Sequence, residues 1–164
     1  MTRRLHTEIW LPEPPERVFE FFGDAFNLDA LTPPWLQFKV LTPAPIAMRV
    51  GTLIDYRIKI HGVPVRWRTE ITAWQPPHRF VDEQRRGPYR LWQHEHLFRA
   101  ERGGTTVIDH VAYAARFALL EPLLYRWFVR RDVERIFAYR AEQLHARFGG
   151  PGVRAAASAA TLGR

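Results

Sequence analysis

Hydrophobic and polar side chains alternate along much of the chain, and a period of two is typical of strands that bury one face. Residues 52–60 are the clearest case, because Ile54, Tyr56 and Ile58 alternate there with charged residues. Glycine and proline pairs separate the alternating segments and mark turns. The pattern predicts seven strands, at residues 5–11, 36–41, 52–60, 65–74, 79–84, 89–100 and 105–115. One polar and one buried face indicate an antiparallel sheet that is covered on a single side.

Helices are expected in two places. Pro15 opens a short helix after the first strand, because proline fits the first helical turn. Asp24 is a suitable N-cap for a second short helix that ends near Leu31. Residues 121–148 place hydrophobic side chains near helical spacing, and a helix of that length spans roughly 40 Å at about 1.5 Å per residue. This long helix is expected to cover the sheet, and the alanine-rich residues 149–164 are expected to be a flexible tail.

The composition indicates a single globular domain at residues 1–148. The chain has 164 residues, of which 46% are hydrophobic and 13% aromatic. It has no cysteine, which excludes disulfides and thiol catalysis and fits a reducing compartment. No hydrophobic run resembles a signal peptide or a membrane span. We therefore expect a cytoplasmic protein with no integral membrane association.

The chain is basic, with a formal net charge of +7. Arginine supplies nearly all of the positive charge, because Lys39 and Lys59 are the only lysines. We find no motif typical of nucleic-acid binding, so a solvated basic surface is the preferred interpretation and no nucleic-acid partner is expected. An interaction module whose basic face docks an acidic protein or an anionic membrane is a further functional class to test.

Several short motifs accompany this order of elements. Two of them follow the first strand, Pro15-Glu16-Arg17-Val18-Phe19 and Leu31-Thr32-Pro33-Pro34-Trp35. Three lie in the predicted sheet: Trp67 and Ile71 with Trp74-Gln75-Pro76-Pro77-His78-Arg79-Phe80-Val81-Asp82; Gly87-Pro88-Tyr89 with Trp92, His94, His96 and Phe98; and Thr106 with Asp109 and Tyr113. The last, Ile136-Phe137-Ala138-Tyr139-Arg140, lies in the long helix. Together they resemble the START-like, birch-pollen-allergen-like superfamily, also called SRPBCC, over about residues 3–148. Within it they are similar to a bacterial subgroup described as ligand-binding or polyketide cyclase/dehydrase-like.

The resemblance implies an α+β helix-grip fold, in which a curved seven-stranded antiparallel sheet wraps around the long C-terminal helix. Two short helices follow the first strand in this fold. The superfamily includes lipid carriers, hormone receptors, cyclases and chaperone regulators, so the fold alone does not define an activity.

Residues 89–100 carry the candidate chemistry. Trp92, His94, His96 and Phe98 share one face of this strand because strand side chains alternate. A hairpin closed by Gly103-Gly104 places these four residues opposite Tyr113, Val111, Asp109 and Val107, in that order, with Phe80, Asp82 and Gln84 beside them. A register shift of one residue would exchange every partner.

Three interpretations of the histidines are open. In the first, Asp109 orients His96, which acts with His94 as a candidate general base, and Tyr113 donates a hydrogen bond. In the second, which we prefer, these groups satisfy one another as a buried polar network. The third is a zinc site, for which two histidines and one aspartate are a minimal ligand set, so no metal or other cofactor is expected.

The aromatic face and the long helix predict an apolar cavity between them. A buried Arg140 on the helix requires a carboxylate partner, with Asp109 and Asp82 the nearest candidates. The expected lining residues are Phe22, Phe26, Trp35, Ile54, Tyr56, Ile58, Trp67, Thr69, Ile71, Asp82, Gln84, Trp92, His94, His96, Tyr113, Trp127 and Arg140.

The leading functional hypothesis is a non-catalytic binder or carrier of a hydrophobic small molecule, such as a lipid, a polyketide or an isoprenoid-like compound. It rests on the aromatic face and on the lack of a complete nucleophile or metal constellation. The alternative is a cyclase or dehydratase-type enzyme that uses the His96–Asp109 pair. The protein is expected to be a monomer or a weak homodimer.

Overall fold

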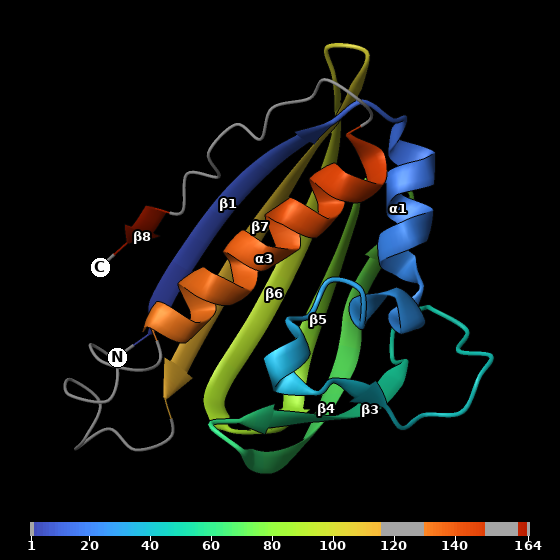
Figure 1. Cartoon of the computed structure of the whole chain (residues 1–164). Helices are drawn as coiled ribbons and strands as arrows, with labels where there is room; N and C mark the ends of the chain where they lie inside the picture. Colours follow the sequence, from blue (N-terminus) through green and yellow to red (C-terminus); the bar gives the residue numbers. More distant parts are fainter. Residues whose placement is uncertain (1, 116–129, 150–160, 164) are drawn as a thin grey trace.

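The computed structural model describes residues 2–115, 130–149 and 161–163. Eight antiparallel strands form one curved sheet in the order β2-β3-β4-β5-β6-β7-β1-β8 (Figure 1). The strands are β1 (Arg3–Leu11), β2 (Lys39–Val40), β3 (Leu53–Ile60), β4 (Val63–Gln75), β5 (Arg79–Arg86), β6 (Tyr89–Glu101), β7 (Gly104–Ala115) and β8 (Thr161–Gly163). The predicted helix-grip sheet of seven strands is confirmed, and β8 adds a short eighth strand.

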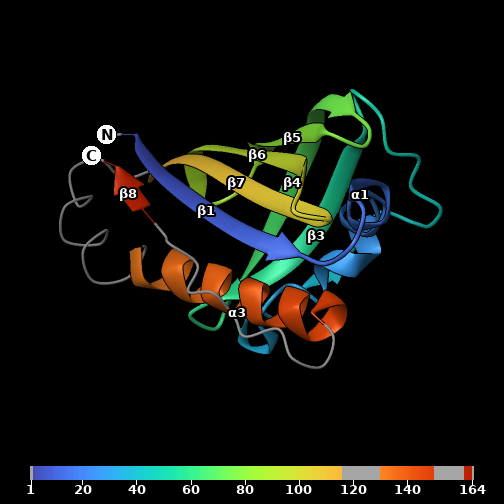
Figure 2. The same ribbon diagram turned by 90° about the horizontal axis from the view of Figure 1, so that it is seen from above.

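Helices occupy one side of this sheet. They are α1 (Pro15–Gly23), the 3-10 helices η1 (Ala25–Leu28) and η2 (Pro34–Leu36), and α3 (Arg130–Phe148). Figure 2 shows α3 lying along one face of the curved sheet, while α1 lies at one end of the sheet. The buried residues of α3 follow the three- and four-residue spacing of a single helix face. They are Val133, Phe137, Arg140, Leu144 and Phe148.

The segment after the first strand folds as its sequence predicts, with two differences. Pro15 occupies the first turn of α1, and the Asp24 side chain accepts a hydrogen bond of 2.9 Å from the backbone N–H of Phe26. The second short helix is a 3-10 helix of four residues rather than an α-helix. The strand expected at residues 36–41 shortens to β2, because η2 continues to Leu36 and Gln37 then takes the left-handed conformation with φ 43°.

Two expectations fall partly outside the described residues. The long helix is described only over Arg130–Phe148, so its expected first turns at 121–129, with Trp127, lie outside. The stretch expected to be a flexible tail contributes Thr161–Gly163 to the sheet, where β8 pairs with Arg4, Leu5 and His6 of β1. Residues 150–160 and 164 lie outside the described chain.

The hydrophobic core contains separate clusters of buried residues. One cluster lies where α1 meets the sheet, and there the Phe19 ring packs against Phe80 and Phe98 at centroid distances of 5.8 and 5.2 Å. A second cluster joins Leu5 and Tyr113 of the sheet to Val133 and Phe137 of α3. Across the parts of the chain that the structure describes, no helix is both long enough and apolar enough to cross a bilayer.

Candidate functional site

A cavity of about 200 Å³ lies between the sheet and α3. Strands β3, β4, β5 and β6 form its floor, the first half of α3 forms one wall, and α1, η1 and η2 form another. The lining is mostly apolar, with Ile54, Ile58, Ile71, Trp67, Trp92 and Phe137 among its members. A few polar groups converge in it, which is the usual composition of a small-molecule site.

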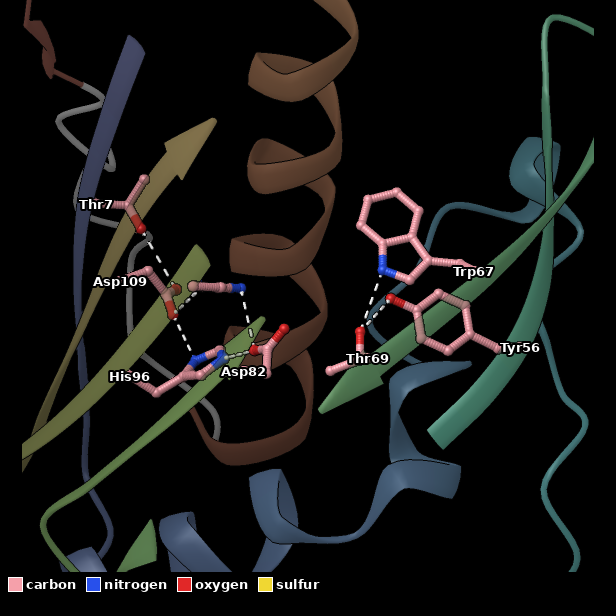
Figure 3. A network of polar contacts seen from close by, with 8 residues as sticks. Thr7, Tyr56, Trp67, Thr69, Asp82, His96 and Asp109 are labelled. Atoms are coloured by element: carbon pink, nitrogen blue, oxygen red, sulfur yellow. Dashed lines mark hydrogen bonds and ion pairs between the residues drawn. The ribbon is translucent and has the colours of Figure 1, made fainter. Parts of the chain in front are cut away.

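The β3–β4 side of the cavity carries a ring of aromatic residues around one hydroxyl. Thr69 Oγ1 accepts a hydrogen bond of 3.1 Å from Trp67 Nε1 and lies 3.2 Å from Tyr56 Oη (Figure 3). The Tyr56 and Trp67 rings stack at a centroid distance of 5.8 Å, and Trp92 meets Trp67 edge-on at 5.4 Å. Burial raises the pKa of Tyr56 well above its usual value, so its phenol stays protonated.

The opposite side holds a buried polar cluster made of Asp82, His94, His96 and Asp109. Asp109 Oδ1 lies 3.0 Å from His94 Nε2 and 2.7 Å from His96 Nδ1. Asp82 Oδ2 lies 3.2 Å from His96 Nε2 and 3.8 Å from His94 Nδ1. Each imidazole therefore has a carboxylate on both sides, and Figure 3 shows His96 between Asp109 and Asp82.

The sheet register creates this cluster. His96 pairs with Asp109 across β6 and β7, and His94 pairs with Asp82 across β5 and β6. Thr7 of β1 completes the arrangement, because its hydroxyl donates to Asp109 Oδ2 at 3.4 Å. The predicted pairing of Trp92, His94, His96 and Phe98 with Tyr113, Val111, Asp109 and Val107 is confirmed at every position.

The pKa values of the residues in this cluster are shifted in different directions. Burial lowers the pKa of His94 to about 4, and the charge of His96 adds to the effect. Burial also acts to lower the pKa of His96, but hydrogen bonds to Asp109 and Asp82 raise it above the usual value. For Asp109, burial is outweighed by the charge of Arg140 and by hydrogen bonds from both histidines, so its pKa lies well below the usual value. The Asp109 side chain is therefore ionised and His94 is neutral, while the pKa of His96 is shifted toward its charged form.

Arg140 reaches the cavity from α3 and is only 9% exposed. Its guanidinium lies over the Phe22 ring at 5.1 Å and near the Phe137 ring at 5.8 Å. Its Nε is buried and has no hydrogen-bond partner among the described residues. The expected burial is confirmed. The expected direct ion pair is not formed within the described chain, and Arg140 acts on Asp109 through its charge at longer range.

Twelve of the seventeen expected lining residues border the cavity. They are Phe22, Ile54, Tyr56, Ile58, Trp67, Thr69, Ile71, Asp82, Trp92, His94, His96 and Arg140. Trp127 lies outside the described residues. The candidate catalytic residue Asp109 lies behind the two histidines and does not border the cavity.

Four expected lining residues lie elsewhere. Phe26 and Trp35 are 42% and 49% exposed, and Trp35 packs under the Arg135 guanidinium on the outer side of α3. Gln84 turns to the β5–β6 connection, where its amide donates to the Tyr89 carbonyl at 2.7 Å. Tyr113 is only 1% exposed and belongs to the core cluster beside Leu5. It does not border the cavity, so the expectation that it donates a hydrogen bond to a substrate there was wrong.

Some lining residues were not expected from the sequence. Phe38 falls in the stretch predicted as a strand at residues 36–41 but lies outside β2 in the structure, and Met48 comes from a segment without strand or helix periodicity. Asp132 at the start of α3 borders the cavity and lies 2.7 Å from His61 Nε2, which links the β3–β4 turn to the helix. His61 of the β3–β4 turn therefore has a specific partner on α3.

Asp82, His94 and His96 are the described residues whose side chains approach closely enough to hold a metal ion together. One ligand atom from each lies within 4.8 Å of the other two. All three border the cavity.

The curved sheet, the helix α3 that lies across it and the cavity between them define a helix-grip domain. Residues 11–141 match the family model described as polyketide cyclase / dehydrase and lipid transport, so the chain belongs to that family. The SRPBCC superfamily predicted from the sequence motifs is thereby confirmed. A comparison with curated proteins found no match.

Solved structures share the fold at low sequence identity. TTHA0849 from Thermus thermophilus is 21% identical with a TM-score of 0.67, covering 92% of this chain and 99% of that protein. The major latex-like protein 151 of Panax ginseng is 12% identical with a TM-score of 0.60, covering 90% of this chain and 97% of that protein. Ara h 8.0201 is 15% identical with a TM-score of 0.59, covering 89% and 99%. At these identities the likeness establishes the fold alone.

Proposed function

We propose that this domain binds a hydrophobic small molecule of the lipid, polyketide or isoprenoid-like kind in the cavity beneath α3. The observation that carries the proposal is a mostly apolar cavity into which a few polar side chains converge. Ile54, Ile58 and Ile71 offer no polar atom to a ligand, whereas Asp82, His96 and Arg140 do. A ligand with an apolar body and one polar end matches this division.

The size of the cavity limits the ligand. About 200 Å³ is below the roughly 300–1,000 Å³ that drug-sized ligands occupy. We infer that the occupant is a small ring system or a short acyl chain rather than a complete diacyl lipid. Its polar end would lie near Arg140, whose buried Nε has no partner within the described residues.

The geometry favours binding over the alternative of acid–base catalysis by His96. A general base needs a free ring nitrogen that a substrate proton can reach. Both nitrogens of His96 already face carboxylates, at 2.7 Å from Asp109 and 3.2 Å from Asp82. His96 therefore supports the cavity wall in this proposal. A cytoplasmic location, a monomer or weak homodimer and the lack of a nucleic-acid partner stay predictions.

Two measurements test the proposal. Native mass spectrometry after mild purification detects a bound molecule directly. Titration with the dye 1-anilinonaphthalene-8-sulfonate, followed by displacement of the dye with fatty acids and aromatic polyketides, measures affinity. Ile58→Phe places extra atoms in the cavity, because Ile58 borders it and is 8% exposed. We expect this change to weaken binding about tenfold or more.

The matched control is Val63→Phe on β4, a residue that is 62% exposed. It should bind like the unmodified protein. Equal affinity in Ile58→Phe and Val63→Phe, or no saturable binding of any compound, would show that the cavity is not a ligand site.

A further inference from the structure

We propose that Asp82, His94 and His96 form a binding site for a divalent transition metal, with Zn²⁺ as the best-fitting ion. Two imidazoles and one carboxylate are a ligand set that zinc uses in sites that keep an open position. This inference goes beyond the proposed function and does not depend on it, because the metal is a separate ligand with its own test.

The spacing of the three donor atoms suits one small ion. Ligands about 2.0–2.1 Å from a tetrahedral zinc lie roughly 3.3 Å from one another. Asp82 Oδ2 lies 3.2 Å from His96 Nε2 and 3.8 Å from His94 Nδ1, and one donor from each residue lies within 4.8 Å of the others. All three residues border the cavity, so an ion bound by them would present its open position to the cavity.

Asp109 provides the support that metal-binding histidines usually have. Ligating histidines almost always donate their second ring N–H to a carboxylate or carbonyl, which fixes the tautomer. Here the second nitrogens are His94 Nε2 and His96 Nδ1, at 3.0 and 2.7 Å from Asp109 Oδ1. Asp109 does not border the cavity and is held from behind by Thr7. One carboxylate thus orients both rings so that their other nitrogens turn toward Asp82.

Without a metal ion, the hydrogen bonds between the two imidazoles and the two carboxylates require a buried charge on a ring. A neutral imidazole has one N–H, so it can donate to one carboxylate only. Three of the four ring nitrogens lie within hydrogen-bond distance of a carboxylate, so donation by all three requires one of the two rings to be charged, although both are buried and their centroids are 3.8 Å apart. A metal ion at Asp82 removes this conflict, because it takes one lone pair from each ring and leaves the two N–H groups to Asp109. In the described structure His96 Nδ1 makes no well-directed hydrogen bond despite its short distance to Asp109.

The nearby charges favour an anionic or carbonyl oxygen at the open position. Two carboxylates balance a divalent ion, and Arg140 adds a positive charge that acts on Asp109. The metal would therefore take as its further ligand a water, a hydroxide or an oxygen of the molecule in the cavity.

A second group of side chains that can bind zinc lies on the outer face of the sheet, and it supplies the control variant. His6 and His110 stack at 4.9 Å beside Glu8 and Glu95, and such a surface group can hold zinc loosely. His110→Gln removes a donor there without touching the cavity. Asp82→Asn keeps the shape of the proposed ligand and removes its charge.

The experiment uses full-length protein without a histidine tag, freed of metal by a chelator. We expect the unmodified protein to bind one equivalent of Zn²⁺ in competition with a chromophoric chelator. Asp82→Asn should weaken that affinity roughly tenfold or more, and His110→Gln should leave it unchanged. Loss of binding in His110→Gln with full binding in Asp82→Asn would assign the metal to the outer face and overturn the proposal.

X-ray absorption at the zinc edge of the unmodified protein keeps the test independent of folding in the variants. The proposal requires two imidazoles in the coordination shell, whereas zero or one would overturn it. The lack of any saturable one-equivalent uptake would also overturn it. The dye titrations of the proposed function are run with and without chelator, so failure of the metal site leaves cavity binding to be judged separately.

Discussion

Asp109 lies directly opposite His96 across β6 and β7, and its Oδ1 contacts both His96 and His94. The Asp109 carboxylate is only 3% exposed, and it connects β7 to the two histidines of β6 that border the cavity. The same residue accepts a hydrogen bond from the Thr7 hydroxyl of β1, so the polar cluster and its support come from four strands, β1, β5, β6 and β7. The cluster therefore links the stability of the sheet to the shape of the cavity.

Replacement of Asp109 should destabilise the protein strongly. Asp109→Asn removes the ionised carboxylate that contacts both buried histidines, and removal of one partner from a buried pair costs about 3–5 kcal/mol. The free energy of unfolding from urea denaturation measures the loss. Glu95→Gln is the control, because Glu95 pairs with Arg79 and His110 at a more exposed position. A loss below about 1 kcal/mol in Asp109→Asn would contradict a structural role for the pair.

Arg140 should be a determinant of ligand choice rather than of stability. Its guanidinium is buried without an ion pair inside the described chain, and replacement of a buried charge by an apolar side chain is often neutral for folding. Arg140→Met should therefore unfold at a similar urea concentration. It should lose most of any preference for a carboxylate-bearing ligand over the matching alcohol.

The comparison requires titration of a medium-chain fatty acid and its alcohol into both proteins. A charge-assisted hydrogen bond is worth about 1.5–3 kcal/mol, so the affinity ratio should fall about tenfold or more. Arg135→Met changes an exposed arginine of the same helix and should keep the ratio. The same ratio in Arg140→Met as in the unmodified protein would remove Arg140 from ligand recognition.

The aromatic core beside α1 should be the most sensitive apolar region. Phe98 is 3% exposed and its ring contacts Phe19 and Phe22, each at 5.2 Å. Phe98→Ala should cost about 3–5 kcal/mol, the usual loss for a buried phenylalanine. Leu91→Ala on the outer face of the same strand, where Leu91 is 40% exposed, should change the free energy of unfolding by less than about 1 kcal/mol. Similar losses in the two variants would mean that this region is not the main core.

The sheet and its register were predictable because alternation is a local property. The period of two around His94 and His96 sets which side chains share a face, and the Gly103-Gly104 turn sets the partner of each residue. Gly103, with φ 73°, and Arg102, with φ 52°, adopt the positive backbone angles that this tight turn requires. In the structure the two turn residues are Arg102 and Gly103, because Gly104 already pairs with Glu101, and the His96–Asp109 pair follows from that turn.

The cavity walls outside the sheet were less predictable. Phe26 and Trp35 are aromatic residues near the right place in the chain, yet the 3-10 helices that carry them turn both outward. Phe38 and Met48 line the cavity from irregular segments, where no period indicates direction. The ion pair expected for Arg140 depends on side-chain reach across the cavity, and sequence spacing carries no information on that distance.

The hydroxyl of Thr69 should couple the two aromatic side chains that contact it. Trp67 Nε1 donates to it at 3.1 Å, and Tyr56 Oη lies 3.2 Å away. Thr69→Val keeps the shape but removes the oxygen, which leaves the buried Trp67 N–H without its acceptor and costs about 1–3 kcal/mol. Tyr56→Phe removes only the second contact and should cost about 1 kcal/mol.

The two changes share one oxygen atom, so their losses should not add. In Thr69→Val the Tyr56 hydroxyl has already lost its partner, and removal of that hydroxyl then relieves an unsatisfied group. The double variant should therefore be as stable as Thr69→Val or slightly more stable, with an interaction energy of about 1 kcal/mol or slightly more from the four free energies of unfolding. Val63→Ala, combined with Tyr56→Phe as an exposed control on β4, should give simple additivity. Additive losses in the Thr69 and Tyr56 pair would show that the hydroxyl does not join the two rings.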